Sequence, residues 1–178
     1  EAGEVWHLLD TRMKMPITKI QMRNFRSVTL DKYNSLVMVS GSYSQLDSIQ
    51  LQKLKQWVSK GNTLITIANA SKWAIDKKLV KETLTKKPKA DKEKNIERSS
   101  YVNASEELGR ERLGGAIFEV DLDVTHPLGF GYHSSSLPVY KNNKVFLSPS
   151  KNAYSTVAKY TKNPHIDGFI SDENLNVF

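Results

Sequence analysis

A corner between a predicted strand and a predicted helix carries the residues of this sequence that come closest to a catalytic arrangement. Residues 63–75 read TLITIANASKWAI, so a β-branched, apolar run ends at Asn69-Ala70-Ser71 and an amphipathic segment begins at once. In open α/β sheets, nucleophiles and ligands gather at corners of this kind. A nucleophile there is usually a Cys or Ser on a tight turn flanked by Gly. This corner has no Gly, and Ser71 falls where a helix N-cap is expected. We therefore interpret it as a degenerate elbow with a structural serine.

The four histidines, at positions 7, 126, 133 and 165, do not have the spacing of a metal site. His126 and His133 share an irregular stretch rich in Gly and Ser, where they are close enough in sequence to approach one another. A loop histidine beside Pro is more often a structural hydrogen-bonding residue than a ligand. We predict no metal and no cofactor in this chain. The candidates for ligand-facing residues are Asn69, Ser71, His126 and His133. A hydrolase that uses Ser71 and His133 stays open as an alternative, with no residue identified to orient the imidazole.

The net charge of +7 raises the question of nucleic acid, and the charge is unevenly spread. Between Lys72 and Arg98 there are ten Lys or Arg against five Asp or Glu, so this stretch supplies +5 of the total. It alternates in sign and its charged part lacks aromatic residues, unlike a stacking surface for nucleic acid. We interpret about 85–100 as a charged, mobile loop and predict no nucleic-acid partner. A polyanion binder that uses the Lys72–Arg98 loop is the second alternative.

Length and composition restrict the remaining classes. A chain of 178 residues is long enough for one domain with a real core, and we predict a single domain over 1–178. The absence of Cys excludes disulfides, thiolate metal sites and a Cys nucleophile. No apolar run approaches the roughly 18 residues that cross a bilayer, so we predict no membrane span.

Strand-like and helix-like segments alternate along the chain. Helices are predicted over 4–13, from a capping box at Ser44 and Asp47 to Gly61, and over 72–84. Strands are predicted at 17–22 (ITKIQM), 35–41, 63–68 and 114–124, with late short strands in KVFLSPS and YSTVAKYT. The runs 35–41 and 63–68 are apolar enough for adjacent parallel strands covered on both faces. Leu54 and Val58 are predicted to pack over them. The order β-α-β-α with short connections predicts an α/β fold with a mostly parallel sheet.

Three stretches together resemble a known family: EAGEVWHLLDTRMKMPITKI, YNSLVMVSGSYSQLDSIQLQKLKQWVSKGNTLITIANASKW and GGAIFEVDLDVTHPLGFGYHSSSLPVY. They are similar to the class I glutamine amidotransferase-like domain that follows the catalytic domain in zinc carboxypeptidases of the Bacteroidetes type. The stretches at Trp6-His7 and Gly115–Glu119 point to this peptidase subgroup. The resemblance implies a flavodoxin-like three-layer sandwich, and this chain would be a fragment of that domain, trimmed at both ends.

What the resemblance implies about chemistry is mostly negative. Catalytic amidotransferases carry a Cys nucleophile at the elbow, and the matching place here is about Asn69. The peptidase's zinc ligands, a His-x-x-Glu pair and a distant His, belong to another domain of the parent and have no counterpart here. The resemblance therefore implies a non-catalytic accessory or scaffold domain of a secreted or periplasmic zinc metallocarboxypeptidase. Its expected partners are the peptidase domain and a peptide or glycan bound near it.

Overall fold

The computed structural model describes residues 2–85 and 100–178, which divide into two compact units, Glu1–Lys81 and Glu82–Phe178. Each unit has its own sheet and its own core, and we describe each by itself. The prediction of one amidotransferase-like domain over 1–178 stays a prediction. The loop predicted to be mobile at about 85–100 lies outside the described residues, apart from its two end positions.

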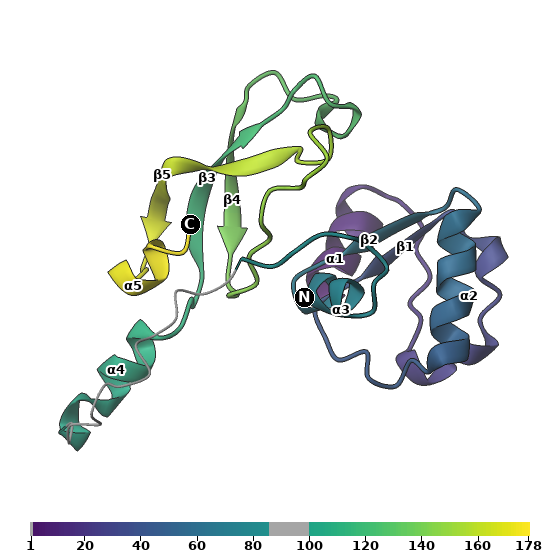
Figure 1. Cartoon of the computed structure of the whole chain (residues 1–178), viewed down its shortest axis with the longest axis horizontal. Coiled ribbons are helices and arrows are strands. Elements are labelled where there is room, and N and C mark those ends of the chain that lie inside the picture. Colours follow the sequence, from purple (N-terminus) through teal and green to yellow (C-terminus); the bar gives the residue numbers. More distant parts are fainter. Residues whose placement is uncertain (1, 86–99) are drawn as a thin grey trace. The chain divides into compact units, whose positions relative to one another are not determined.

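The first unit contains a two-stranded parallel sheet with helices packed near it (Figure 1). Its elements are α1 (Ala2–Trp6), a π-helical segment (His7–Arg12), two 3₁₀ helices (Met22–Ser27 and Leu30–Lys32), β1 (Ser35–Met38), α2 (Ser48–Ser59), β2 (Thr63–Thr66) and α3 (Asn69–Asp76). Ser35 lies opposite Thr63, and Met38 lies opposite Thr66. The predicted pair of adjacent parallel strands is therefore confirmed. The predicted strand ITKIQM is wrong: it has no strand, and Met22 already begins a 3₁₀ helix.

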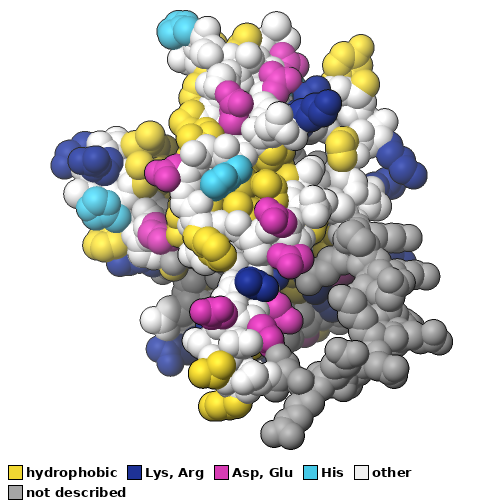
Figure 2. Space-filling model, turned by 90° about the vertical axis from the view of Figure 1, so that its left-hand side faces the viewer, with side chains coloured by type: hydrophobic (Ala, Val, Ile, Leu, Met, Phe, Trp, Pro, Cys, Tyr) yellow, Lys and Arg dark blue, Asp and Glu magenta, His cyan; other side chains and the backbone are white. Residues whose placement is uncertain are grey.

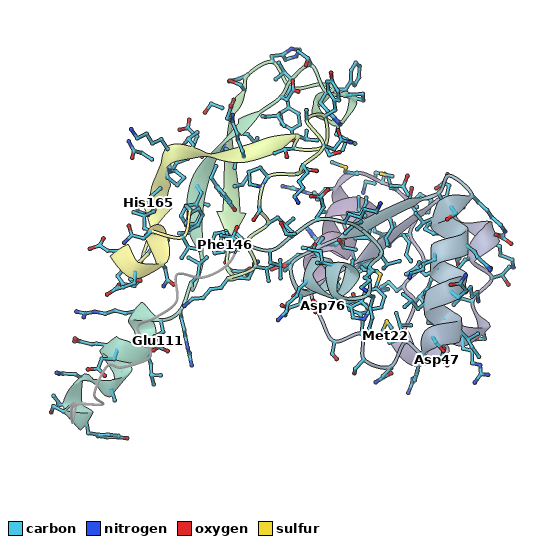
Figure 3. All side chains as sticks on the ribbon, in the orientation of Figure 1. Met22, Asp47, Asp76, Glu111, Phe146 and His165 are labelled. Atoms are coloured by element: carbon cyan, nitrogen blue, oxygen red, sulfur yellow. The ribbon has the colours of Figure 1, made fainter. Side chains whose placement is uncertain are left out.

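Helix α2 begins at a capping box and ends at a glycine. The Asp47 carboxylate accepts a hydrogen bond from the Gln50 backbone N–H at 2.8 Å, and the Asp47 N–H donates to the Gln50 side chain at 2.9 Å. Figure 3 shows Asp47 at the end of α2. The box predicted at Ser44 and Asp47 is therefore wrong by one helical turn, because Asp47 is the first partner of the box and not the second. Gly61, at φ 94°, follows the helix as predicted.

The core of the first unit lies between α2 and one face of the small sheet. Leu54 is fully buried and Trp57 nearly so. The Trp57 indole N–H donates to the carbonyls of Leu30 and Tyr33, at 2.9 and 3.1 Å. These bonds fasten α2 to the 3₁₀ segment before β1. On the other face of the sheet, Ile65 is 46% exposed, so the prediction that both faces of β2 are covered is wrong.

The second unit is built on a three-stranded antiparallel sheet with β3 in the centre (Figure 1). Its elements are a 3₁₀ helix (Tyr101–Asn103), α4 (Ala104–Arg110), β3 (Ala116–Leu122), a 3₁₀ turn (Pro127–Gly129), β4 (Ser136–Lys141), β5 (Ala158–Gly168) and α5 (Asp172–Leu175). The predicted strand 114–124 is confirmed in β3, and the end of YSTVAKYT enters β5. Strand β4 was not predicted. KVFLSPS forms only a single bridge, between Leu147 and Leu84.

Buried and more exposed side chains alternate along β3, so one face of the strand lies in the core and the other carries polar residues. Ala116, Phe118, Val120 and Leu122 are all buried. Phe178 stacks on Phe118 with ring centroids 4.2 Å apart, and Phe146, labelled in Figure 3, meets Phe178 edge-on at 4.8 Å. Aromatic pairs of this geometry add to the hydrophobic gain from burying the rings.

The protein is thus a mixed α/β chain with a small parallel sheet and a separate antiparallel sheet. The α/β class is confirmed at this level. The parallel pairing is limited to β1 and β2 in the described residues, and the flavodoxin-like three-layer arrangement stays a prediction.

Candidate functional site

The connection between β2 and α3, which we call the elbow (residues 66–71), has a strained backbone. Ala68 has φ 50° and ψ −113°, a region that residues with a Cβ rarely adopt. Both sides of the turn are hydrogen-bonded. The Ile67 N–H donates to the Met38 carbonyl at 2.9 Å, which extends the parallel ladder, and the Ala68 carbonyl accepts from Ser71 N–H at 3.0 Å. The ladder and the first helical turn together hold Ala68 in this conformation. Such strain costs on the order of 1–3 kcal/mol.

The residue on the strained turn is the one that carries the reacting group in a nucleophile elbow. In this chain that residue is Ala68, whose side chain is a methyl group with nothing to donate or to attack. The sequence interpretation placed the matching position at about Asn69, and the dihedral angles move it to Ala68. Asn69 is exposed, with its backbone N–H 3.4 Å from the Ser40 hydroxyl, and Ala70 is fully buried. Sequence reasoning missed Ala68 because alanine gives no sign of a positive φ.

Ser71 has a structural partner in place of a catalytic one. Its hydroxyl donates to the Thr66 carbonyl at 2.9 Å and lies 3.0 Å from the Thr66 hydroxyl. The prediction that Ser71 is the N-cap is wrong, because α3 begins two residues earlier, at Asn69. Ser71 instead ties the first turn of α3 to the end of β2. Ser71 belongs to the first unit and His133 to the second, and both contacts of the Ser71 hydroxyl described above are with Thr66.

His126 is a structural hydrogen-bonding residue, as the sequence suggested. Its Nδ1 accepts a hydrogen bond from the Leu128 backbone N–H at 3.1 Å and caps the turn Pro127–Gly129. An Nδ1 that accepts has no proton, so the neutral ring is protonated at Nε2. The Thr125 hydroxyl and N–H beside Asp123 hold the pKa of that carboxyl below its usual range, with a smaller contribution from His126. His133 is exposed and has no hydrogen-bond partner in the part of the chain that the structure describes.

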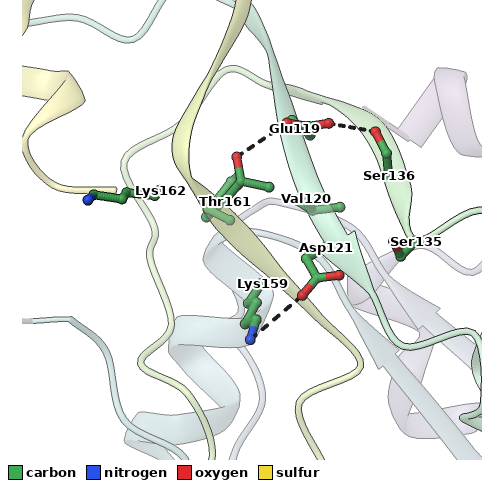
Figure 4. Close-up of a pocket in the computed structure, with 9 residues that line it drawn as sticks. Glu119, Val120, Asp121, Ser135, Ser136, Lys159, Thr161 and Lys162 are labelled. Atoms are coloured by element: carbon green, nitrogen blue, oxygen red, sulfur yellow. Dashed lines mark hydrogen bonds and ion pairs between the residues drawn. The ribbon is translucent and has the colours of Figure 1, made fainter.

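The polar face of the antiparallel sheet contains an open hollow of about 360 Å³ (Figure 4). Glu119 lies across it: one carboxylate oxygen accepts from the Ser136 hydroxyl at 2.6 Å, and the other lies 3.5 Å from the Thr161 hydroxyl. Asp121 pairs with Lys159 at 3.7 Å. Both carboxylates therefore join β3 to its neighbouring strands. The exposed ion pair between Asp121 and Lys159 contributes about 0–1 kcal/mol.

This hollow was not among the sequence candidates. Its signal was present in AIFEVDLDV, where Glu119 and Asp121 occupy alternate positions and so share one face of a strand. On the face of the molecule in Figure 2, acidic and basic side chains are interspersed and form no broad field of one sign among the coloured residues. The described surface in that view therefore has no predominant charge that would attract an oppositely charged partner. Residues 86–98 of the Lys72–Arg98 loop lie outside the described residues, and the polyanion alternative stays a prediction.

Lys141, at the end of β4, is buried, and it has no carboxylate partner among the described residues. Its side-chain ammonium donates to the Val145 carbonyl at 2.8 Å and to the Asn143 side chain at 3.2 Å, and it lies 4.3 Å from the centre of the Phe146 ring. Burial lowers the pKa of Lys141 to about 8. The group holds the turn after β4 against the aromatic core, because its bonds go to residues of that turn.

The described residues carry neither a metal cluster nor a membrane-spanning helix. Residues 2–85 and 100–178 contain no group of three or more His, Cys, Asp or Glu placed to hold a metal ion. Within the same ranges, no helix has both the length and the apolar composition for crossing a membrane. Comparison of the chain with protein-family models, with curated proteins and with solved structures finds no match.

Proposed function

We propose that this chain is a non-catalytic accessory domain of the amidotransferase-like, flavodoxin-like type, and that it belongs to a secreted or periplasmic zinc metallocarboxypeptidase. There it acts as a scaffold for the peptidase domain and binds a peptide or glycan near it. The link to the peptidase rests on the resemblance of the three sequence stretches. The non-catalytic part rests on the elbow.

The observation that carries the proposal is the combination of strain and inert chemistry at Ala68. A non-glycine residue at φ 50° is costly, and such strain is concentrated at functional sites. The turn has the shape that presents a nucleophile at a strand-to-helix corner, but the residue there has no reactive group. The neighbouring hydroxyl of Ser71 is bonded back to Thr66. A retained backbone without its chemistry supports a former enzyme domain that now serves another role.

The zinc of such a peptidase belongs to its catalytic domain and not to this chain. Among the described residues, the side chains that ligate zinc are not clustered, so they do not fit a zinc site. No step through zinc is assigned to this chain.

The proposal is tested with the purified chain in two measurements. The first is hydrolysis of glutamine and of C-terminal peptide residues. We expect no turnover of either, because the sequence has no Cys nucleophile and the residues that the structure describes form no metal-ligand cluster. Carboxypeptidase turnover that a chelator abolishes would overturn the non-catalytic assignment. The second is titration of the chain against a recombinant zinc carboxypeptidase catalytic domain of the resembled family. Formation of a complex supports the scaffold role. A titration without heat of binding, together with separate elution of the two proteins, would refute it.

A further inference from the structure

The outer edge of β1 carries the backbone groups of Val37, which have no partner within the described ranges 2–85 and 100–178. Asn34 and Met38 accept hydrogen bonds from Thr63 and Ile67, so the even-numbered residues of β1 turn their N–H and C=O groups toward β2. Because these groups alternate along a strand, Val37 turns its N–H and C=O to the other edge. Neither group of Val37 has a hydrogen-bond partner in the described part of the chain. The Val39 carbonyl, by contrast, accepts a hydrogen bond from the Tyr43 hydroxyl.

The sequence at this edge lacks two of the usual protections against strand pairing, charged residues and proline. Natural edge strands carry charged residues or proline, or are bulged or covered. The fourteen residues 33–46 contain no Lys, Arg, Asp, Glu or Pro, although charged residues make up 25% of the chain. β1 pairs with β2 in regular register without a bulge. Nothing in the edge sequence therefore repels an uncharged strand.

The small sheet of the first unit is packed on one face and partly open on the other. A sheet of two strands is marginal in water, and a third strand or packing on its faces is what stabilises it. One face packs on the core, but Ile65 on the other face is 46% exposed, and its neighbour in the register is Val37. A strand added at the β1 edge would extend this apolar face beside Val37.

We propose that the outer edge of β1 binds an extended, uncharged peptide segment, which adds to the sheet as a third strand. The backbone of the segment bonds to Val37 N–H and C=O, and its alternate apolar side chains pack beside Val37 and Ile65. The lack of charge over 33–46 selects an uncharged segment, since a buried unpaired charge on the peptide would be costly. This inference rests on the peptide-binding role in the proposed function and gives that role a location.

The test uses hydrogen exchange of the whole chain with a defined probe, the acetylated and amidated peptide Thr-Val-Thr-Val-Thr-Val-Thr. At about 1 mM peptide, a concentration that detects weak binding, the Val37 and Val39 amides should exchange roughly tenfold more slowly. The amides of Leu36 and Met38, which already face β2, should change little. Unchanged exchange at Val37 would overturn the proposal. So would slowing in the absence of peptide that rises with protein concentration, because the occupant would then be a second copy.

Two variants separate pairing from general stabilisation. Val37→Pro removes the N–H at an edge position where proline is tolerated, and it should abolish the slowing at Val39. Val37→Thr keeps the N–H and a β-branched side chain, and it should bind as the parent does. Equal binding by both variants would contradict backbone pairing. This assay needs no peptidase domain, so its failure and a failed titration against that domain are distinguishable.

Discussion

At the scale of single residues, the hydroxyl of Ser71 has a structural role that can be measured as a loss of stability. Replacing Ser71 by Ala removes the bond to the Thr66 carbonyl and should lower the free energy of unfolding by about 1 kcal/mol. Urea denaturation measures this, and the slope of the transition should not change. The matched control is Ser44→Ala, at an exposed serine whose hydroxyl lies 3.2 Å from that of Ser42, and it should be nearly neutral. If Ser71→Ala is as neutral as the control, the bond to Thr66 is not stabilising.

Lys141 gives the protein a specific pH dependence. Its pKa of about 8 is below the ordinary value of 10.5, so the unfolded chain binds more protons than the folded one between these values. The stability contribution of Lys141 therefore rises with pH from about 8 toward 10.5, by at most about 3 kcal/mol, and solvent screening of the ammonium reduces this amount. Burial raises the pKa values of Tyr43 and Tyr160, which lowers stability above pH 10. The window to measure is pH 7–10.

The control for this pH dependence is Lys141→Met, which keeps a long apolar side chain over Phe146 and has no titrating group. Unfolding by urea at pH 7, 8, 9 and 10 should show a rise for the parent that the variant lacks. A rise of the same size in both proteins would assign the effect to other groups.

At the scale of elements, α2 and β2 contribute to the same core to very different extents. Leu54 is fully buried, and Leu54→Ala should cost about 2–5 kcal/mol. Ile65 is 46% exposed, and Ile65→Ala should cost less than about 1.5 kcal/mol, because the truncated side chain leaves no closed cavity. Thermal unfolding of the two variants measures the contrast. Equal losses would show that the exposed face of β2 is covered in solution.

The elements also show which sequence signals were sufficient. Apolar runs ending at polar turns predicted β1 and β2, because short apolar runs bounded by turn residues are typical of strands, and the segment that contains β3 was also predicted. Strand β4 was missed because Pro138 and the Ser-rich approach to it read as a loop, whereas Pro is tolerated on an edge strand. ITKIQM alternates well but forms no strand, since alternation is a local pattern and pairing needs a partner in space.

At the scale of the whole molecule, the sequence predicted the α/β class and the position of the elbow, and it did not predict the division into two units. Hydrophobic periodicity, a local pattern, predicts the alternation of helices and strands. The antiparallel pairing of β3 with β4 and β5 joins residues that are far apart in the chain, and no local pattern predicts it. The strained residue was misplaced by one position, from Ala68 to Asn69, because only the backbone dihedral angles identify it.

The proposed function requires an elbow that keeps its strained backbone without a reacting group. The most direct measurement compares the thermal stability of the whole chain with Ala68→Gly and with Ala70→Gly. Gly accepts φ 50° without strain, but it also gives the unfolded chain more conformational entropy. The relief of strain should exceed this entropy effect, so Ala68→Gly should stabilise the chain by about 1 kcal/mol. Ala70→Gly should destabilise it by about 1 kcal/mol or more, because Ala70 is buried inside α3. Opposite shifts in the midpoint are the predicted result. A loss of stability in both variants would contradict a strained turn at Ala68, and with it the degenerate elbow.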